Sequence, residues 1–224
     1  MKVLGIIPAR GGSKGIPNKN IKILNGKPLI CFTIDAAKGS LLNRIVVSTD
    51  CKKIAKVSKE NGSEVIMRPG NLAKDDTPTL PVIQDVLNKI DEKFDAVMVL
   101  QPTSPIRNQT HINEAINLFI EKKEDSLVSV VKVPHNFNPE SIYSLENELL
   151  TNYSNTEKKI FNRQNKKTYY ARNGPAIILT KTNIIQNSNS FYGKKITPYI
   201  MSVEHSFDID EPIDFKIAKS LLGS

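Results

Sequence analysis

Residues 8–20 read Pro-Ala-Arg-Gly-Gly-Ser-Lys-Gly-Ile-Pro-Asn-Lys-Asn and follow directly on the apolar run Val3–Ile7. This order indicates a short buried strand that ends in a loop rich in both glycine and positive charge. Glycine tolerates unusual dihedral angles and lets backbone N–H groups approach a ligand closely. Cationic side chains beside such a backbone favour a polyphosphate ligand. The glycines are Gly11, Gly12 and Gly15, and the cations are Arg10, Lys14 and Lys19.

Charge and spacing narrow the kind of phosphate site. From Met1 to Ile34 the chain has six Lys or Arg residues and no Asp or Glu, so nothing local neutralises the loop. The loop lacks both G-x-x-x-x-G-K-[ST], the spacing of a P-loop, and G-x-G-x-x-G, the spacing of a dinucleotide-binding fold. A surface turn rich in Gly, Pro and Asn, with incidental lysines, is the alternative interpretation.

Composition indicates a globular protein with anionic ligands. The chain has 224 residues, of which 39% are hydrophobic and 24% charged, and its formal net charge is +8. The length fits a single domain over residues 1–224, and the excess of positive charge favours anionic partners. The sequence has no Trp and no basic helix interleaved with aromatic residues. A small phosphorylated substrate therefore explains the charge at least as well as nucleic acid, which we do not expect as a partner.

Targeting signals and cysteines add little to this interpretation. Val3–Ile7 is short for a signal peptide, and Arg10 follows it without a small-residue cleavage site, so a cytoplasmic location is expected. No apolar run approaches the length of a membrane span, and we expect no membrane partner. Cys31 and Cys51 have no metal-ligand spacing and are expected to be buried free thiols.

Strand and helix patterns alternate over the first 133 residues. Residues 80–90 and 112–120 each place their apolar side chains on one helical face, with Thr110 as the expected N-cap of the second helix. This alternation predicts an α/β fold with a mostly parallel sheet and helices on both faces. Ligands of such sheets bind at the carboxyl ends of the strands. Strand patterns cover residues 2–8, 44–48, 64–67, 96–100, 126–133, 175–180 and 196–201, and a terminal helix is expected at 211–222.

The alternation breaks between residues 134 and 171. This segment is rich in asparagine and has little periodicity, yet it carries many large apolar residues such as Phe137, Leu149 and Tyr153. Large apolar side chains without a helix of their own indicate a surface that packs on something, and a subunit interface is our preferred interpretation. A floppy insertion is the alternative.

Two carboxylates stand near the carboxyl end of the chain, in Phe207-Asp208-Ile209-Asp210. Alternate residues of an extended segment face the same side, so Asp208 and Asp210 can point together. A pair of carboxylates near a basic phosphate loop favours a hard divalent cation, Mg²⁺ or Mn²⁺, with both aspartates as ligands. The alternative is that Asp210 only caps the terminal helix.

Three further polar turns follow predicted strands. Gln101-Pro102-Thr103-Ser104 offers an amide and two hydroxyls, which either bind a ligand or cap the next helix. The Arg68 guanidinium can stack on or hydrogen-bond to a pyrimidine, or form an ion pair with Asp75 or Asp76. Arg172-Asn173 precedes a Gly-Pro turn, in which the arginine can simply face solvent. The histidines His111, His135 and His205 are scattered and are expected to be structural or on the surface.

Taken in order, these motifs resemble the CMP-sialic acid synthetase (acylneuraminate cytidylyltransferase) family over nearly the whole chain. The matching elements are the loop at 8–20, the Gln-Pro-Thr-Ser-Pro-Ile-Arg turn at 101–107 and the Asp-Ile-Asp at 208–210. The family has Leu where this chain has Ile106. The resemblance implies transfer of CMP from CTP to the anomeric hydroxyl of a nonulosonic acid, with release of pyrophosphate. It also implies a homodimer formed through an element inserted at 134–171.

The resemblance assigns roles to individual residues. It implies catalytic roles for Arg10, Lys19, Asp208 and Asp210, with both aspartates holding the metal. It implies acceptor binding by Gln101, Thr103, Ser104, Arg172 and Asn173. It implies nucleotide binding by Ala9, Arg10, Gly11, Gly12, Ser13, Lys14, Asn20 and Arg68.

Alternatives remain open at this point. A related synthetase acting on keto-deoxyoctulosonate usually has a first loop of the form Ser-x-Arg-Leu-Pro-Gly-Lys, from which residues 13–20 depart. Sialic, legionaminic and pseudaminic acids are not distinguished, because the acceptor choice depends on the shape of the pocket. A non-catalytic nucleotide- or RNA-binding α/β protein would use the basic loop but has no need of paired aspartates.

Overall fold

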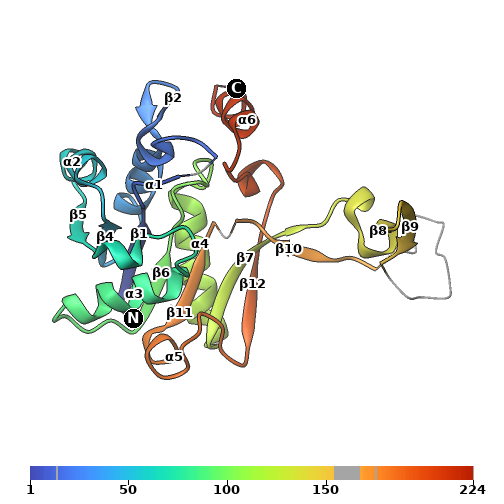
Figure 1. Ribbon diagram of the computed structural model, residues 1–224. Coiled ribbons are helices and arrows are strands. Elements are labelled where there is room, and N and C mark those ends of the chain that lie inside the picture. The colour runs from blue at the N-terminus through green and yellow to red at the C-terminus, as the bar shows by residue number, and fades with distance from the viewer. Residues whose placement is uncertain (14, 154–166, 175, 224) are drawn as a thin grey trace.

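The computed structural model describes residues 1–13, 15–153, 167–174 and 176–223. Its centre is an eight-stranded sheet in the order β10-β7-β11-β6-β1-β4-β5, with β12 also paired to β7 (Figure 1). The strands are β1 (Val3–Pro8), β4 (Arg44–Thr49), β5 (Glu64–Met67), β6 (Ala96–Val99), β7 (Ser126–Lys132), β10 (Tyr170–Arg172), β11 (Ile178–Lys181) and β12 (Ile196–Met201).

The sheet is mixed, with its parallel part around β1. β1 pairs in parallel with both β4 and β6, and β4 pairs in parallel with β5. β12 is parallel to β7, whereas β10 and β11 are antiparallel to β7. The predicted α/β fold with a mostly parallel sheet is therefore confirmed, and the carboxyl ends of β1, β4, β5 and β6 lie along one edge.

Helices cover both faces of the sheet, as expected from its continuously apolar strands. They are α1 (Leu29–Lys38), α2 (Lys52–Glu60), α3 (Thr79–Lys89), α4 (Gln109–Lys122), α5 (Thr182–Asn187) and α6 (Pro212–Leu221). Shorter pieces are β2 (Ile23–Leu24), β3 (Lys27–Pro28) and the 3-10 turns η1 (Lys19–Ile21), η2 (Gly70–Leu72) and η6 (Glu204–Ser206).

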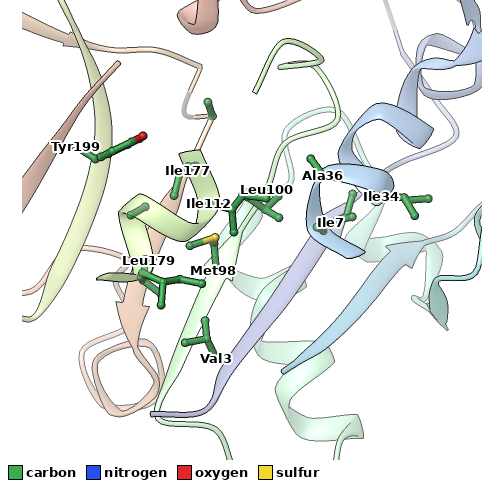
Figure 2. Close-up of a cluster of buried hydrophobic side chains, with 14 of the residues drawn as sticks. Val3, Ile7, Ile34, Ala36, Met98, Leu100, Ile112, Ile177, Leu179 and Tyr199 are labelled. Carbon is green, nitrogen blue, oxygen red and sulfur yellow. The ribbon is translucent and has the colours of Figure 1, made fainter. Parts of the chain in front are cut away.

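Strand alternation divides the core into two layers. Val3 and Ile7 of β1 face α1 and α4, together with Met98 and Leu179 (Figure 2). Leu4 and Ile6 of the same strand face the other way and pack with α3 and α5. Full burial of each such side chain contributes roughly 1.5 to 3 kcal/mol. The two layers fix the sheet and so hold the carboxyl ends of its strands in place.

A third, smaller apolar cluster joins the two ends of the chain. Ile16 from the first loop and Ile209 from the last segment are both buried, and they pack with Leu24, Leu29 and Ala218. Ala218 belongs to α6, which lies beside β2 (Figure 1). This cluster brings the glycine-rich loop next to the segment that carries the two aspartates.

An arm, residues 134–153, leaves the sheet after β7 and returns through β10 (Figure 1). It contains η3 (His135–Phe137), η4 (Pro139–Ser141) and the hairpin β8–β9 (Tyr143–Glu146 and Leu149–Asn152). Its large apolar residues are exposed: Leu145 and Leu149 are each 71% accessible, and Leu150 and Tyr153 are each 69% accessible. Residues 154–166 of the predicted insertion lie outside the described part.

The N-terminus of α4 differs from the prediction. Asn108, not Thr110, is the N-cap, and its side chain accepts a hydrogen bond from the His111 backbone N–H. The His111 Nδ1 in turn accepts from the Asn108 N–H at 3.1 Å. The imidazole thus takes the place of the Glu or Gln in a capping box, which is why the usual sequence signature did not find it.

Two further observations concern the cysteines and the lengths of the helices. Cys31 is buried as expected, but Cys51 is only partly buried; both are free thiols. Within the residues described above, no helix is both long and apolar enough to cross a bilayer.

The His111 ring predicts a stability that depends on pH. Its pKa is lowered to about 4, chiefly by burial and then by His205, 4.5 Å away between ring centroids, and by Arg107, while Glu114 acts in the opposite direction. Between pH 6.5 and 4 the unfolded chain therefore binds more protons than the folded one, so stability falls as the pH falls through this window. His111→Gln keeps a cap acceptor without titrating. Between pH 7 and 4.5 the free energy of unfolding of this variant, measured by urea denaturation, should fall by about 1 kcal/mol less than that of the wild type.

The control for this experiment is His135→Gln, which replaces an exposed imidazole. It should leave the pH dependence of the wild-type protein unchanged. An equal dependence of the free energy of unfolding on pH in the wild-type and His111→Gln proteins would contradict the prediction.

Candidate functional site

A pocket of about 340 Å³ lies at the carboxyl ends of the parallel strands. It is lined by residues from four separate parts of the chain, and eight of the sixteen predicted site residues are among them. The polar lining residues are Arg10, Ser13, Lys19, Asn20, Arg68, Lys74, Asp75, Thr77, Thr79, Gln101, Thr103 and Asp210. A larger cavity of about 900 Å³ between α3, α4 and α5 contains none of the predicted residues.

The glycine-rich loop is held against the rest of the site by its backbone. The Gly11 N–H donates to the Asp50 carboxylate at 3.0 Å, and the Asn20 side chain donates to the Arg10 carbonyl at 3.0 Å. A Cβ on Gly11 would come within 2.8 Å of the Cβ of Cys51, so only glycine fits there. Lys14, a predicted nucleotide ligand, lies outside the described residues.

Lys19 links this loop to the far end of the sequence. Its ammonium donates to the Ile209 carbonyl at 2.7 Å and to the Asp210 carboxylate at 3.2 Å. The side chain of Lys19 is only 14% exposed, whereas that of Asp210 is 74% exposed. The lysine is thus fixed at the pocket wall, and the aspartate reaches into solvent beside it.

Two arginines face the same pocket but have different partners. Arg10 forms an ion pair with Asp75. Arg68 is nearly buried and lies 3.8 Å from the Asp50 carboxylate, rather than beside Asp75 or Asp76 as the alternative interpretation expected. Its Nε has no hydrogen-bond partner among the described residues, and burial lowers the pKa of this arginine. The pocket therefore keeps a positive potential close to the phosphate loop.

The turn after β6 contributes both surface and buried groups. Gln101 and Thr103 line the pocket, whereas Ser104 is fully buried and its hydroxyl donates to Asp208 at 3.3 Å. Arg107 lies beneath the turn, 1% exposed, and donates to the Thr33 hydroxyl at 2.7 Å and the Gln101 carbonyl at 3.3 Å. Burial lowers the pKa of Arg107 to about 9.

The two predicted metal ligands differ in their surroundings. Burial raises the pKa of the Asp208 carboxyl and the nearby Asp210 raises it further, against hydrogen bonds from Thr103 and Ser104 and the charge of Lys19. Asp210 does not cap α6, because Glu211 is the N-cap and Asp214 completes the capping box. Among the described residues no three His, Cys, Asp or Glu side chains form a metal-binding cluster. Two carboxylates are still a fitting set for Mg²⁺, which also takes phosphate and water oxygens.

Three of the predicted acceptor ligands, Ser104, Arg172 and Asn173, do not line the pocket, and neither does the predicted metal ligand Asp208. Arg172 is exposed and donates to the Tyr192 hydroxyl at 2.7 Å. Asn173 is 4% exposed and its amide is engaged inside the protein. Conversely, sequence reasoning missed Lys74, Thr77 and Thr79, which line the pocket from the segment before α3 and from its first residue. Their only signal was their position after the Arg68-Pro69 turn.

The arrangement suits a ligand that carries several phosphates. Lys19, Arg10 and Arg68 supply positive charge in the lining, and Asp210 supplies carboxylate oxygens beside it, whereas Asp208, on the same segment, is not part of the lining. This arrangement suits electrostatic stabilisation of phosphate charge.

Such a fold and pocket define a nucleotidyltransferase. The model of the cytidylyltransferase family matches residues 4–222, and the chain belongs to that family.

Two curated relatives are similar to this chain over nearly its whole length. The N-acylneuraminate cytidylyltransferase of Escherichia coli O18:K1:H7 is 34% identical over 221 residues, 97% of this chain and 51% of that protein. The CMP-N,N'-diacetyllegionaminic acid synthase of Legionella pneumophila is 37% identical over 230 residues, 99% of this chain and 97% of that protein. The chain thus spans about half the length of the Escherichia coli relative and nearly all of the Legionella one.

Solved structures share the fold at low sequence identity. A CMP:2-keto-3-deoxy-manno-octonic acid synthetase in complex with CTP superposes with a TM-score of 0.76 at 14% identity, covering 100% of this chain and 99% of that one. A 4-diphosphocytidyl-2C-methyl-D-erythritol synthase from Anaerococcus prevotii gives a TM-score of 0.67 at 11% identity, with coverage of 100% and 99%. These likenesses confirm the fold of the chain.

The contact between Gly15 and Asp210 gives a test of the phosphate loop. A Cβ on Gly15 would come within 2.7 Å of the Asp210 carbonyl oxygen, so Gly15→Ala must push the loop away from the aspartate segment. We expect affinity for inorganic triphosphate, measured by calorimetry, to fall about tenfold, the effect of losing one or two charge-assisted hydrogen bonds. Gly70→Ala, where a Cβ meets no atom within 4 Å, should stay within about twofold of wild type. Equal affinities in all three proteins would show that the loop does not hold phosphates.

Proposed function

We propose that this chain is a cytidylyltransferase that transfers CMP from CTP to the anomeric hydroxyl of a nonulosonic acid and releases pyrophosphate. The observation that carries the proposal is the link from Lys19 to Ile209 and Asp210, which brings the segment with both aspartates next to the cationic glycine loop. The full-length match to the Legionella synthase supports the sialic or legionaminic type of acceptor.

In this proposal the loop holds the leaving group. Arg10, Lys19 and the backbone of Gly11 and Gly12 bind the β- and γ-phosphates, and Ser13 and Asn20 add hydrogen bonds. Positive charge there stabilises the negative charge that develops on the departing pyrophosphate. Arg10 is paired with Asp75 in this structure, so a triphosphate would compete with that carboxylate for the guanidinium.

Asp208 and Asp210 would hold a divalent cation, Mg²⁺ or Mn²⁺. When bound, this cation supplies positive charge to the phosphate oxygens and acidifies a hydroxyl. Hydroxyls from Ser104 and Thr103 orient the Asp208 carboxylate and, with the Lys19 ammonium, oppose the rise in its pKa that burial causes. Arg68, nearly buried in the pocket lining, would contact the nucleotide base.

Gln101 and Thr103 would bind the acceptor, because they line the pocket on the side of the aspartates. Arg172 remains a proposed ligand for the acceptor carboxylate; its guanidinium is exposed and would have to leave the Tyr192 hydroxyl. A keto-deoxyoctulosonate acceptor is the second candidate, supported by the shared fold of the synthetase noted above. The first loop, which departs from that subfamily's usual form, favours a nonulosonic acid.

Pyrophosphate release with CTP, Mg²⁺ and a panel of nonulosonic acids tests this function. We expect turnover with at least one sialic, legionaminic or pseudaminic acid. Asp208→Asn combined with Asp210→Asn should lower the rate by a factor of about a hundred or more, because the phosphates lose their cation. Asp91→Asn, an exposed carboxylate remote from the pocket, is the matched control. Turnover in the double variant equal to that of the control would disprove the metal assignment.

The proposal includes a homodimer formed through the arm at 134–153, which belongs to an insertion at 134–171. Most of its large apolar side chains are exposed, and it has no apolar core of its own among the described residues. Its hairpin pairs Leu145 with Leu150 across the two strands, so one face presents a continuous apolar surface. A second copy of the chain is the proposed partner of this surface, in the cytoplasm.

Leu145→Glu combined with Leu150→Lys tests the dimer. The two changes put opposite charges on directly paired positions, so the hairpin keeps a favourable cross-strand pair while its surface becomes polar. Light scattering should give the monomer mass of 25.0 kDa for this variant and twice that mass for the wild type. Ile213→Glu, a comparably exposed change on α6, should leave the dimer intact. A monomeric wild type would contradict the proposal.

A further inference from the structure

The strand that runs antiparallel to β7 is interrupted beside the site. Arg172 of β10 is paired with Val130, and Ile178 of β11 is paired with Val128. Of the described residues between them, Asn173, Gly174, Ala176 and Ile177 therefore stand opposite the single residue Ser129. Such an extra length of chain in one strand bulges away from its partner, and bulges are frequent beside functional sites.

At this interruption of the strand, the Asn173 side chain forms hydrogen bonds to the neighbouring segments. Its Oδ1 accepts from the Ser129 hydroxyl at 2.6 Å and from the Ala176 N–H at 3.4 Å. Its Nδ2 donates to the Ser206 hydroxyl at 3.0 Å and lies 3.2 Å from the Met201 sulfur. Both ends of a buried amide are thus engaged within the protein, which leaves it little capacity for a ligand.

The next residue brings the bulge against Asp208. Gly174 has a φ of 106°, and a Cβ there would lie 3.0 Å from the Cγ and Oδ1 of Asp208. Backbone without a side chain is therefore required at this point. The bulge held by Asn173 forms one wall of the space in which the Asp208 carboxylate sits.

Ser206 begins the segment that carries both aspartates. Further along, the Ile209 N–H donates to the Thr103 carbonyl at 2.9 Å, and the Ile209 carbonyl accepts from Lys19. The Asn173 amide ties the start of the same segment to β7 through Ser129. The segment is thereby fixed at both ends, with Asp208 between them.

We propose that Asn173 is a positioning residue for the carboxylate pair, acting through Ser206 and Gly174, and not a ligand of the acceptor. This inference rests on the proposed metal role of Asp208 and Asp210. It explains why a buried amide with no face toward the pocket occupies this position. Its consequence is that a change at Ser206, which touches no substrate, alters how the site uses its metal.

The test centres on Ser206→Ala, because removal of the buried Asn173 amide itself risks the fold. Ser206→Thr keeps the hydroxyl and should behave as wild type. Ser202→Ala is the matched control, since that hydroxyl contacts His205 at 2.8 Å and not Asn173. Two readouts are measured on the full chain. One is hydrogen exchange at the Ile209 amide without ligands, and the other is the gain in CTP affinity on replacing EDTA with Mg²⁺.

We expect Ser206→Ala to speed exchange at Ile209 about fivefold, the effect of one lost hydrogen bond. The Mg²⁺-dependent gain in CTP affinity should fall by a similar factor, while the affinity in EDTA stays unchanged. Ser206→Thr and Ser202→Ala should stay within about twofold of wild type in both measurements. Wild-type values for Ser206→Ala in either readout would overturn the proposal.

Two comparisons separate this inference from the proposed function. If Asp208→Asn leaves the Mg²⁺-dependent gain intact, the metal role of Asp208 fails. The exchange rate at Ile209 then still decides whether Asn173 positions the segment. A raised KM for the acceptor in Asn173→Ser, with the Mg²⁺-dependent gain unchanged, would show instead that Asn173 binds the acceptor and would overturn the positioning role.

Discussion

The bond from the Lys19 ammonium to the Ile209 carbonyl is the contact on which the site depends. It joins residues 190 positions apart, and the buried pair Ile16 and Ile209 packs beneath it. Without this junction the phosphate loop would be a cationic surface turn and the aspartates an acidic surface segment. Sheet topology alone does not make the junction, because residues 206–210 follow the last strand rather than belonging to the central parallel part. Lys19 and the small apolar cluster around Ile16 and Ile209 are therefore also needed to bring the two segments together.

Two buried guanidinium groups set the electrostatic character of the pocket. Arg68 lies 3.8 Å from the Asp50 carboxylate but has no hydrogen-bond partner for its Nε, and Arg107 has only neutral oxygen partners among the described residues. Removing a charge from water costs several kcal/mol unless it is well paired, so both groups weigh against stability. Their positions explain why they persist. Arg68 lines the pocket, and Arg107 holds the carbonyl of Gln101, whose side chain also lines it. The fold thus carries a local instability that keeps the ligand side of the sheet positive.

Much of the fold was predictable because buried strands and buried helix faces are recognisably apolar in the sequence. The apolar runs of β1, β4 and β6 marked a sheet covered on both faces, and the 3.6-residue period marked α3 and α4. The presence of Arg10, Arg68 and Gln101 in one pocket was also predictable, since strand ends of an α/β sheet meet at one edge. The partners of individual side chains were not. Arg68 lies 3.8 Å from Asp50, Arg10 forms an ion pair with Asp75, and the buried Asn173 amide donates to Ser206 within the protein. Those choices depend on distances between distant segments, which local patterns do not contain.

The position of the aspartate segment also has a consequence for how the protein is made. Synthesis proceeds from the N-terminus, and domains assemble as their parts emerge. The phosphate loop, β1, β4 and β6 are all complete by residue 100, yet Lys19 must wait for Ile209, and β7 for β12 at 196–201. Pairings between such distant segments form slowly because long loops must close first. A nascent chain therefore carries a half-built pocket until residues 206–210 have been synthesised. Only then can the segment with Asp208 and Asp210 join the phosphate loop.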